Sequence, residues 1–346
     1  MELNQKINSL LSLGQLFKSL VDNDVNGLNQ IQQEHLEKGR ALIETVRHEN
    51  AWFTADSVEQ AFAAWGEALV EPKLSQWLKA YAEAKESKAV GVIMAGNIPL
   101  VGLHDALCVL LSGHRLHAKL SSKDASLMAF VLSVLQSLES EWKDKIKVSE
   151  RLNEIDCLVA TGSDNSARYF EYYFKNIQKI IRKNRTSLAI LDGSESADDL
   201  KGLASDVFTY FGLGCRNVTK LYLPKDFDKD RLFEAFYAYR HYAEHNAYAN
   251  NYDYNKAVYL LNKIDLLENG FLLLKEDEAL QSPVGVLFYE QYEDQQELLK
   301  KLEEQADQIQ CIVSKKEQHI PFGKAQQPEL WDYADGVDTM AFLSEL

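Results

Sequence analysis

The sequence predicts an α/β protein in which two α/β domains follow a helical N-terminal region. Residues 1–86 place apolar side chains at three- and four-residue spacing, which is typical of amphipathic helices. From residue 89 onward, short apolar runs alternate with turns and helical stretches, and this alternation starts again near residue 185. Repeated strand, turn and helix units are typical of parallel sheets with helices packed on their faces.

Four helices are predicted in the N-terminal region. Apolar residues on one face predict helices over residues 3–20 and 28–48. Asp56 or Ser57 can cap a third helix that extends to residue 69, and Pro72 can open a fourth that extends to residue 81. Apolar faces of this kind usually lie in a protein core. We therefore expect residues 1–86 to pack on the domain that follows them.

The first α/β domain is predicted to span residues 87–184. Three strand-like runs occupy residues 89–95, 115–120 and 155–160, and each leads through a turn into a helical stretch. Ligands of parallel sheets bind outside the carboxyl ends of the strands. The turns expected at those ends carry polar or small residues, namely Asn97, Lys119, Ser121, Gly162 and Ser163.

These turns have both chemical and ordinary structural uses. The Asn97 amide can donate to an oxyanion. Lys119 and the two serines after it, Ser121 and Ser122, can donate to a ribose hydroxyl or a phosphate. Gly162 and Ser163 can begin a helix whose N–H groups hold a pyrophosphate. However, Asn-Ile-Pro is also a common turn and Gly-Ser a common helix cap. Taken singly, each motif leaves function and plain structure open.

A second α/β domain is predicted over residues 185–320. Its expected strands are 186–191, 219–223, 270–275, 284–289 and 311–313, and its expected helices are 197–210, 230–244, 254–263 and 295–306. An Asn- and Tyr-rich turn is predicted at 249–254. His241 and His245 can share a helix face, but packing is favoured over metal binding because no acidic or Cys ligand accompanies them.

Cys215 stands between Gly212-Leu213-Gly214 and the run predicted as a strand over 219–223. Small residues allow the backbone to turn tightly and a substrate to approach. Backbone N–H groups beside such a thiol can lower its pKa and hold an oxyanion. The alternative interpretation is a small buried hydrophobe in a helix-to-strand corner.

Composition and charge exclude several classes of protein. The net charge of −15 over 346 residues argues against a nucleic-acid partner. Four cysteines without a Cys-x-x-Cys pair suggest neither a structural zinc site nor a disulfide framework, and we expect no metal. The N-terminus does not resemble a signal peptide and no apolar run approaches a membrane span, so we expect a cytoplasmic protein.

Five motifs in order carry a family resemblance. They are Ala95-Gly96-Asn97-Ile98-Pro99, Lys119-Leu120-Ser121-Ser122, Ala160-Thr161-Gly162-Ser163, Gly212-Leu213-Gly214-Cys215-Arg216, and the stretch from Pro321 to Pro328. On these, residues 88–346 resemble the aldehyde dehydrogenase superfamily, and more closely the LuxC-related acyl-CoA reductases. The resemblance implies an aldehyde-dehydrogenase-like fold. In that fold residues 87–184 are a Rossmann-type NADP(H)-binding domain, residues 185–320 are the catalytic domain, and residues 321–346 return to the core or make an oligomer contact.

The resemblance also implies residue roles. Cys215 would be the nucleophile and Asn97 the amide that stabilises the oxyanion. Lys119 would contact the adenosine ribose or its 2′-phosphate, with Ser121 beside it as a further donor. Gly162 and Ser163 would lie by the pyrophosphate or nicotinamide side of NADP(H).

Two departures from the superfamily pattern bear on the reaction. Oxidative members carry a water-activating glutamate upstream of the cysteine, whereas residues 181–185 here hold no carboxylate. An acyl-enzyme that awaits hydride gains nothing from such a base. Asp164, Glu171 and Glu195 are left open as proton donors or bases. The second departure concerns the glutamate that holds the nicotinamide ribose in the superfamily and usually precedes a Gly-Pro pair. It has no clean match near Pro283.

The sequence therefore predicts NADPH-dependent reduction of an acyl-CoA, with a fatty acyl group preferred, to the aldehyde through an acyl-enzyme on Cys215. NADH is the alternative cofactor. A cysteine-dependent acyl-thioester hydrolase or acyltransferase is the rival among enzymes, and a non-catalytic binding subunit is the rival from another class. A homo-oligomer or an acyl-transfer partner protein stays open at this point.

Overall fold

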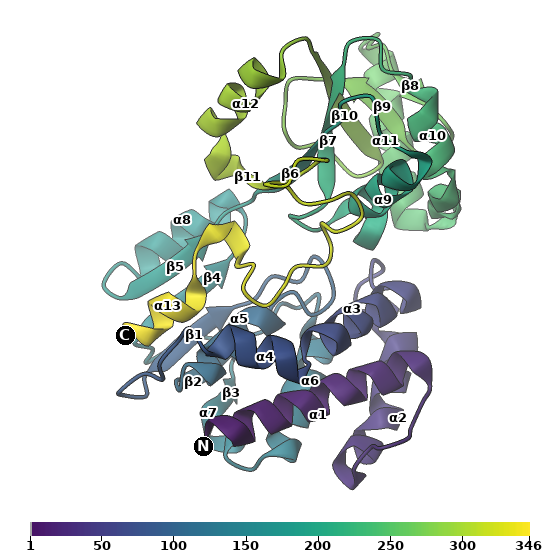
Figure 1. Ribbon diagram of the computed structural model, residues 1–346. Helices are drawn as coiled ribbons and strands as arrows, with labels where there is room; N and C mark the ends of the chain where they lie inside the picture. The colour runs from purple at the N-terminus through teal and green to yellow at the C-terminus, as the bar shows by residue number, and fades with distance from the viewer. Residues whose placement is uncertain (1) are drawn as a thin grey trace. The chain divides into compact units, whose positions relative to one another are not determined.

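The computed structural model describes residues 2–346, without the side chain of Asp164, and divides into two units (Figure 1). Unit 1 comprises the chain up to Lys183 together with Glu329–Leu346, and unit 2 comprises Asn184–Pro328. Each unit holds one mainly parallel sheet. Among the described residues, no helix combines the length and the apolar character needed to cross a membrane.

The sheet of unit 1 has five parallel strands in the order β3-β2-β1-β4-β5. They are β1 (Ala89–Ile93), β2 (Arg115–Lys119), β3 (Ile146–Val148), β4 (Cys157–Thr161) and β5 (Gln178–Arg182). Ile93 pairs with both Lys119 and Ala160, so β1, β2 and β4 end at the same level. Buried side chains on both faces of β1 explain its continuous apolar run.

The N-terminal helices and the sheet of unit 1 share one core. Helix α1 (Leu3–Asp22) packs against α2 (Gln30–Thr45), α3 (Ala55–Ala68) and α6 (Ala125–Leu138), and α4 (Glu71–Leu78) follows α3. The predicted cap of α3 at Asp56 or Ser57 was wrong. Thr54 caps this helix, because its hydroxyl accepts a hydrogen bond from the Ser57 N–H at 3.2 Å.

The last residues of the chain also belong to unit 1. Helix α13 (Thr339–Ser344) packs against α5 (Leu103–Leu111), and His114, which follows α5, places its Nε2 2.8 Å from the Leu343 carbonyl. The Trp77 indole donates to the Tyr333 hydroxyl at 2.7 Å. The segment 329–346 is thus part of the same core as β1 and α4.

The sheet of unit 2 has six strands in the order β11-β6-β7-β10-β9-β8, and only the β8–β9 pair is antiparallel. The strands are β6 (Thr186–Ile190), β7 (Val218–Pro224), β8 (Leu267–Glu268), β9 (Leu273–Glu276), β10 (Val286–Tyr292) and β11 (Ile309–Val313). The helices are α9 (Ala197–Phe208), α10 (Asp230–Phe236), α11 (Asn246–Leu261) and α12 (Gln295–Glu304).

The turn predicted at residues 249–254 was wrong, because these residues lie inside α11. Asn and Tyr have modest helix propensity, but here burial of Tyr248 and Tyr252 favours the helix. The Asn251 amide bonds the Ala247 carbonyl four residues earlier, so a typical turn residue satisfies its donor within the helix. The second half of the helix predicted over 230–244 is a 3₁₀ helix, Tyr237–Glu244.

Several short elements had not been predicted at all. These are β3, β5, β8, α7 (Trp142–Lys145) and α13. Four of them have five residues or fewer, and α13 has six. The three shortest, β3, β8 and α7, contain too few residues to establish a helical or strand periodicity.

Candidate functional site

The turn that carries Cys215 lies between α9 and β7, at the amino end of β7. Tyr210, Phe211 and Gly212 all have positive φ angles, of 53°, 58° and 77°. This left-handed run kinks the chain before Cys215, and it is costly for the two aromatic residues. The side chain of Cys215 is exposed and is not in a disulfide. It is therefore not the buried small hydrophobe of the alternative interpretation.

The buried side-chain amide of Asn217 fixes this turn by hydrogen bonds. Its side chain is fully buried, and its Nδ2 donates to the carbonyls of Asp206, Val207 and Thr209 at 2.9–3.2 Å. Its Oδ1 accepts the Gly214 N–H at 2.8 Å. One side chain thus joins the end of α9 to the residue directly before Cys215. The sequence had not singled out Asn217, because an Asn after a turn is common.

A second buried polar group, Asp206, links the Cys215 turn to the loop 321–328. Its carboxylate accepts the Gly323 N–H at 2.7 Å and the Ala325 N–H at 2.9 Å. Arg216, next to Cys215, donates to the Ala325 carbonyl. Burial raises the pKa of Asp206 to about 6, although the two N–H donors act against that rise. Two of the sequence motifs are therefore joined by hydrogen bonds within unit 2.

The neighbouring strand β6 also contacts the turn. The Ser187 hydroxyl donates to the Cys215 carbonyl at 2.9 Å and lies 3.0 Å from the Cys311 sulfur. Next to the turn, aromatic rings pack closely: Phe208 lies 5.8 Å from Phe271, and Phe211 lies 4.3 Å from Tyr242, between ring centroids. A cavity of about 30 Å³ is left beside Phe208 and Phe211. The aromatic residues are thus a packed cluster with little free space.

The predicted residues of unit 1 gather along the carboxyl edge of its sheet. Asn97 is exposed in the turn after β1, and Lys119 is exposed at the end of β2. The Met94 N–H donates to the Lys119 carbonyl at 3.1 Å, which joins the ends of the two strands. Gly96 lies against Ser121, since an added Cβ would come within 2.7 Å of the Ser121 Cβ. The structure thus brings the Asn97 turn and Ser121 together.

Gly162 and Ser163 lie at the same edge, after β4. Ser163 is the N-cap of α8 (Asp164–Tyr173), and its hydroxyl accepts the Ser166 N–H at 3.3 Å. The first N–H groups of a helix are unpaired within it and attract anions. The capped start of α8 at the end of β4 therefore fits both interpretations of Gly162-Ser163, the structural one as a helix cap and the functional one as an anion site.

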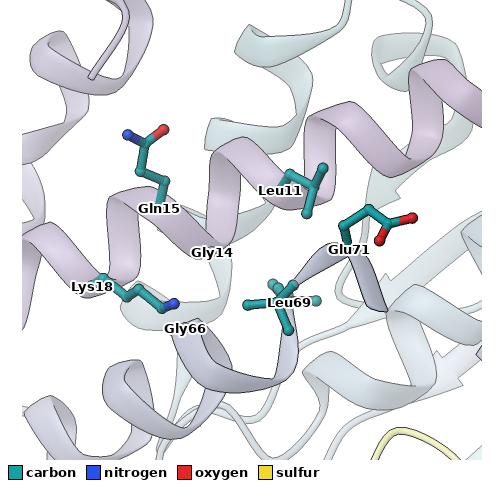
Figure 2. Close-up of a pocket in the computed structure, with 8 residues that line it drawn as sticks. Leu11, Gly14, Gln15, Lys18, Gly66, Leu69 and Glu71 are labelled. Atoms are coloured by element: carbon teal, nitrogen blue, oxygen red, sulfur yellow. The ribbon is translucent and has the colours of Figure 1, made fainter. Parts of the chain in front are cut away.

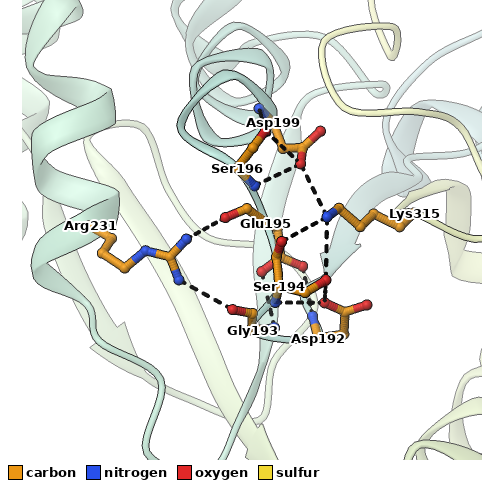
Figure 3. A network of polar contacts seen from close by, with 8 residues as sticks. All are labelled: Asp192, Gly193, Ser194, Glu195, Ser196, Asp199, Arg231 and Lys315. Atoms are coloured by element: carbon orange, nitrogen blue, oxygen red, sulfur yellow. Dashed lines mark hydrogen bonds and ion pairs between the residues drawn. The ribbon is translucent and has the colours of Figure 1, made fainter.

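The three candidate proton donors have different outcomes. Glu195 is buried, and its carboxylate accepts the N–H groups of Asp192 at 2.7 Å and Gly193 at 3.0 Å. Figure 3 shows this loop held also by Arg231, which donates to the Gly193 and Glu195 carbonyls, and by Lys315. The Glu195 carboxylate therefore stabilises this loop by accepting its backbone N–H groups. Glu171 is exposed on α8, and the candidate role of Asp164 falls outside the described side chains.

Two further features are separate from these residues. His245 caps α11 and lies 4.5 Å from the Phe211 ring, and no group of three potential metal ligands occurs among the described residues. A pocket of about 230 Å³ lies between α1 and the end of α3, and Figure 2 shows residues that line it. None of the predicted site residues lines it. Its lining residues are Leu11, Gly14, Gln15, Lys18, Gly66, Leu69, Val70 and Glu71.

Comparison with known proteins identifies the fold. No protein-family model matches the sequence, and no curated protein matches it. Among solved structures, the NAD-dependent aldehyde dehydrogenase from Sinorhizobium meliloti superposes with a TM-score of 0.61 at 12% identity, over 92% of this chain and 71% of that one. The fold is aldehyde-dehydrogenase-like.

Two more structures have the same aldehyde-dehydrogenase-like fold. A propionaldehyde dehydrogenase from the Clostridium phytofermentans fucose utilisation bacterial microcompartment gives a TM-score of 0.60 at 9% identity, over 94% of this chain and 82% of that one. Aldehyde dehydrogenase 21 from Physcomitrella patens, in complex with the reaction product succinate, gives a TM-score of 0.56 at 13% identity, over 89% of this chain and 74% of that one. The predicted fold class is thereby confirmed.

Proposed function

We propose that this chain reduces an acyl-CoA thioester, with a fatty acyl group, to the aldehyde by means of NADPH and a covalent acyl intermediate on Cys215. The observation that carries the proposal is the exposed thiol of Cys215 on a turn that buried Asn217 and Asp206 fix to the rest of unit 2. A rigid backbone beside an accessible thiol suits a nucleophile, because the reacting atom has to be held in place.

The carboxyl edge of unit 1 fits a dinucleotide. Its strand order reverses between β1 and β4, and Asn97 and Gly162 lie in the turns that follow these two strands. Ligands of open parallel sheets bind at such a reversal point. In the proposal the first turn of α8 faces the pyrophosphate, and the exposed Lys119 amine, with Ser121, contacts the adenosine ribose or its 2′-phosphate. NADPH, with NADH as the alternative, supplies a hydride when bound.

The chain's own residues then carry the covalent steps. The Cys215 thiolate attacks the carbonyl carbon, a carbon–sulfur bond forms, and CoA leaves as a thiolate. One thiolate replaces another, so the exchange is nearly balanced in energy. The Asn97 amide and the Cys215 backbone N–H donate to the oxyanion. After reduction of the acyl carbon, the carbon–sulfur bond breaks, the aldehyde leaves and the Cys215 thiolate is restored.

The residues upstream of the cysteine favour reduction over hydrolysis. Arg182 ends β5 and pairs with Asp105 at 2.5 Å, so the stretch 181–185 offers a buried, paired cation and no carboxylate of its own. Desolvation works against the charged guanidinium, but the attraction of Asp105 raises the pKa of Arg182. Glu195 already accepts two backbone N–H groups. Neither the stretch 181–185 nor Glu195 therefore supplies an uncommitted carboxylate to activate water in this proposal.

A spectrophotometric screen tests the function. The protein is mixed with NADPH or NADH and with acyl-CoA substrates from acetyl to palmitoyl, and nicotinamide absorbance, free CoA and aldehyde are followed together. The proposal predicts equal amounts of NADPH oxidised, CoA released and aldehyde formed. Because the aromatic cluster leaves a cavity of only about 30 Å³, the chain-length profile also decides whether a fatty acyl group is accepted.

Three outcomes contradict parts of the proposal. Release of CoA without nicotinamide oxidation indicates a thioester hydrolase or acyltransferase. Neither CoA release nor acyl labelling, with nucleotide binding retained, indicates a non-catalytic binding subunit. Activity confined to acetyl- and propionyl-CoA overturns the fatty-acyl assignment and leaves the reaction class intact.

A further inference from the structure

Asp124 stands at the N-cap of α6 but does not cap that helix. An Asp at this position usually accepts a hydrogen bond from the first turn of its own helix. Here the side chain makes no such bond. Its Oδ2 accepts the Leu100 N–H at 2.9 Å instead, while Oδ1 has no hydrogen-bond partner. Asp124 is fully buried, so its orientation toward Leu100 is a fixed feature of the core.

Leu100 closes the turn that carries Asn97. It adopts a left-handed conformation with φ of 59°, which is rare for a Leu side chain and needs support from its surroundings. At the other end of the turn, a Cβ on Gly96 would come within 3.3 Å of the Asp124 Cβ. Both ends of the turn therefore contact residues 121–124: Gly96 packs against Ser121 and Asp124, and Leu100 donates a hydrogen bond to Asp124.

We propose that Asp124 is a positioning residue, whose buried carboxyl group holds the Asn97 turn against residues 121–124 by accepting the Leu100 N–H. Its link to catalysis rests on the proposed function, because Asn97 is the oxyanion donor only in that reaction. The mechanical part, which is the fixing of the turn, stands on the geometry of unit 1 alone.

The charge state of Asp124 supplies a signature of this role. Burial raises its pKa to about 8, the Leu100 N–H opposes that rise, and the charge of Glu49 adds to it. Glu49 lies in the loop between α2 and α3 and accepts from the Ser126 hydroxyl, while the neighbouring Asn50 amide donates to the Lys123 carbonyl at 3.3 Å. Below about pH 8 the closed turn keeps this carboxyl group protonated, whereas an opened, solvated Asp124 ionises above its ordinary pKa of 3.8. The closed turn is therefore expected to lose stability as the pH rises from about 4 to about 8, and to lose little more above that.

Hydrogen exchange on the full chain tests the mechanical part. Asp124→Ala is expected to speed exchange of the Leu100 amide about tenfold or more, because its acceptor is gone. Asp124→Asn keeps a carbonyl acceptor and is expected to restore exchange to within about threefold of wild type. The wild type, corrected for intrinsic exchange, is expected to loosen between pH 5 and pH 8 and to change little above pH 8, whereas Asp124→Asn is not expected to change over this range.

Thr54→Ala is the matched control, since it removes a true N-cap from α3 in the same unit. It is expected to leave exchange of Leu100 unchanged. Unaltered Leu100 exchange in Asp124→Ala, or an equal increase in Thr54→Ala, overturns the proposal.

Kinetics tests the link to Asn97. In an active wild type, Asp124→Ala is expected to lower kcat at least tenfold with KM nearly unchanged, and Asp124→Asn to recover most of it. An inactive wild type refutes the proposed reaction without touching the exchange result. An active wild type whose kcat is insensitive to Asp124→Ala refutes the positioning role in catalysis.

Discussion

The two units hold their candidate residues in opposite ways. In unit 1, Asn97, Lys119 and Gly162 lie in or beside turns that follow strands, at the carboxyl edge of the sheet. In unit 2, Cys215 precedes its strand and lies at the amino edge. The unit 1 residues are aligned by strand register, because β1, β2 and β4 end at one level. The Cys215 turn is aligned by buried side chains.

This difference determines how each set of candidate residues should respond to substitution. The backbone of a parallel sheet sets where its turns emerge, so replacing an exposed turn residue in unit 1 removes one chemical group and little else. The Cys215 turn contains two aromatic residues in left-handed conformations and depends on Asn217 and Asp206. Replacing either of these buried residues is expected to disturb both stability and the site.

Removal of the thiol is expected to have the largest effect. Cys215→Ala abolishes acylation by acyl-CoA while nucleotide binding to unit 1 is retained, since no acyl thioester can form. Mass spectrometry of the intact protein after mixing with acyl-CoA measures this. Cys311→Ala is the control, because Cys311 is half-buried at β11 and contacts Ser187. Acylation that persists in Cys215→Ala would show that the nucleophile was assigned wrongly.

Removal of the proposed oxyanion donor comes next. Asn97→Ala is expected to lower kcat about 100-fold with KM and nucleotide affinity nearly unchanged. Because Asn97 is exposed, the Tm should stay within about 2 °C of wild type. Asn97→Asp, which keeps the size and loses the amide donor, should behave alike. A large fall in Tm with kcat preserved would make Asn97 a structural residue and break the contrast between the units.

Loss of the buried amide under the Cys215 turn should show the opposite pattern. Asn217→Ala removes four hydrogen bonds and leaves their buried partners unsatisfied, so the free energy of unfolding of unit 2 should fall by about 3 kcal/mol. Urea unfolding combined with hydrogen exchange resolves the two units. Acylation should slow as well, and exchange in unit 1 should not change. A variant as stable as wild type would contradict the role given to Asn217.

The smallest effect is a pH dependence. Burial raises the pKa of Asp206 from 3.8 to about 6, so the folded state binds its proton more tightly than the unfolded state does. Its contribution to stability is complete below pH 3.8 and is lost as pH rises through about 6. Relative to Asp206→Asn, the wild type should lose on the order of 1–3 kcal/mol between pH 4 and pH 6.5.

Urea titrations over this range measure the effect. Asp198→Asn, on the exposed face of the same helix, should track the wild type at every pH. A difference between wild type and Asp206→Asn that stays constant with pH would show that the Asp206 carboxyl group is not perturbed.

Much of the architecture could be predicted from the sequence. The apolar runs at 89–95 and 115–120 and the motif order led to the α/β fold, with strand bounds correct to within two residues at β1 and β2. The prediction failed where burial outweighed local preference, as in α11, and where an element was too short to show a period, as in β3. Among the site residues, exposed turn residues were visible in the sequence. Buried supports were not, because an Asn or Asp reveals its partners only after folding.

The sequence by itself determined which chemical groups this protein carries and which elements bear them, since periodicity and turn residues act over a few neighbours. Only the tertiary structure decided what holds those groups. Asp206 reaches Ala325 across more than a hundred residues, and Asp124 turns from its own helix to Leu100. Such bonds are made when buried polar groups have to find partners away from water, and the chain segments that then supply them are chosen by packing rather than by position in the sequence.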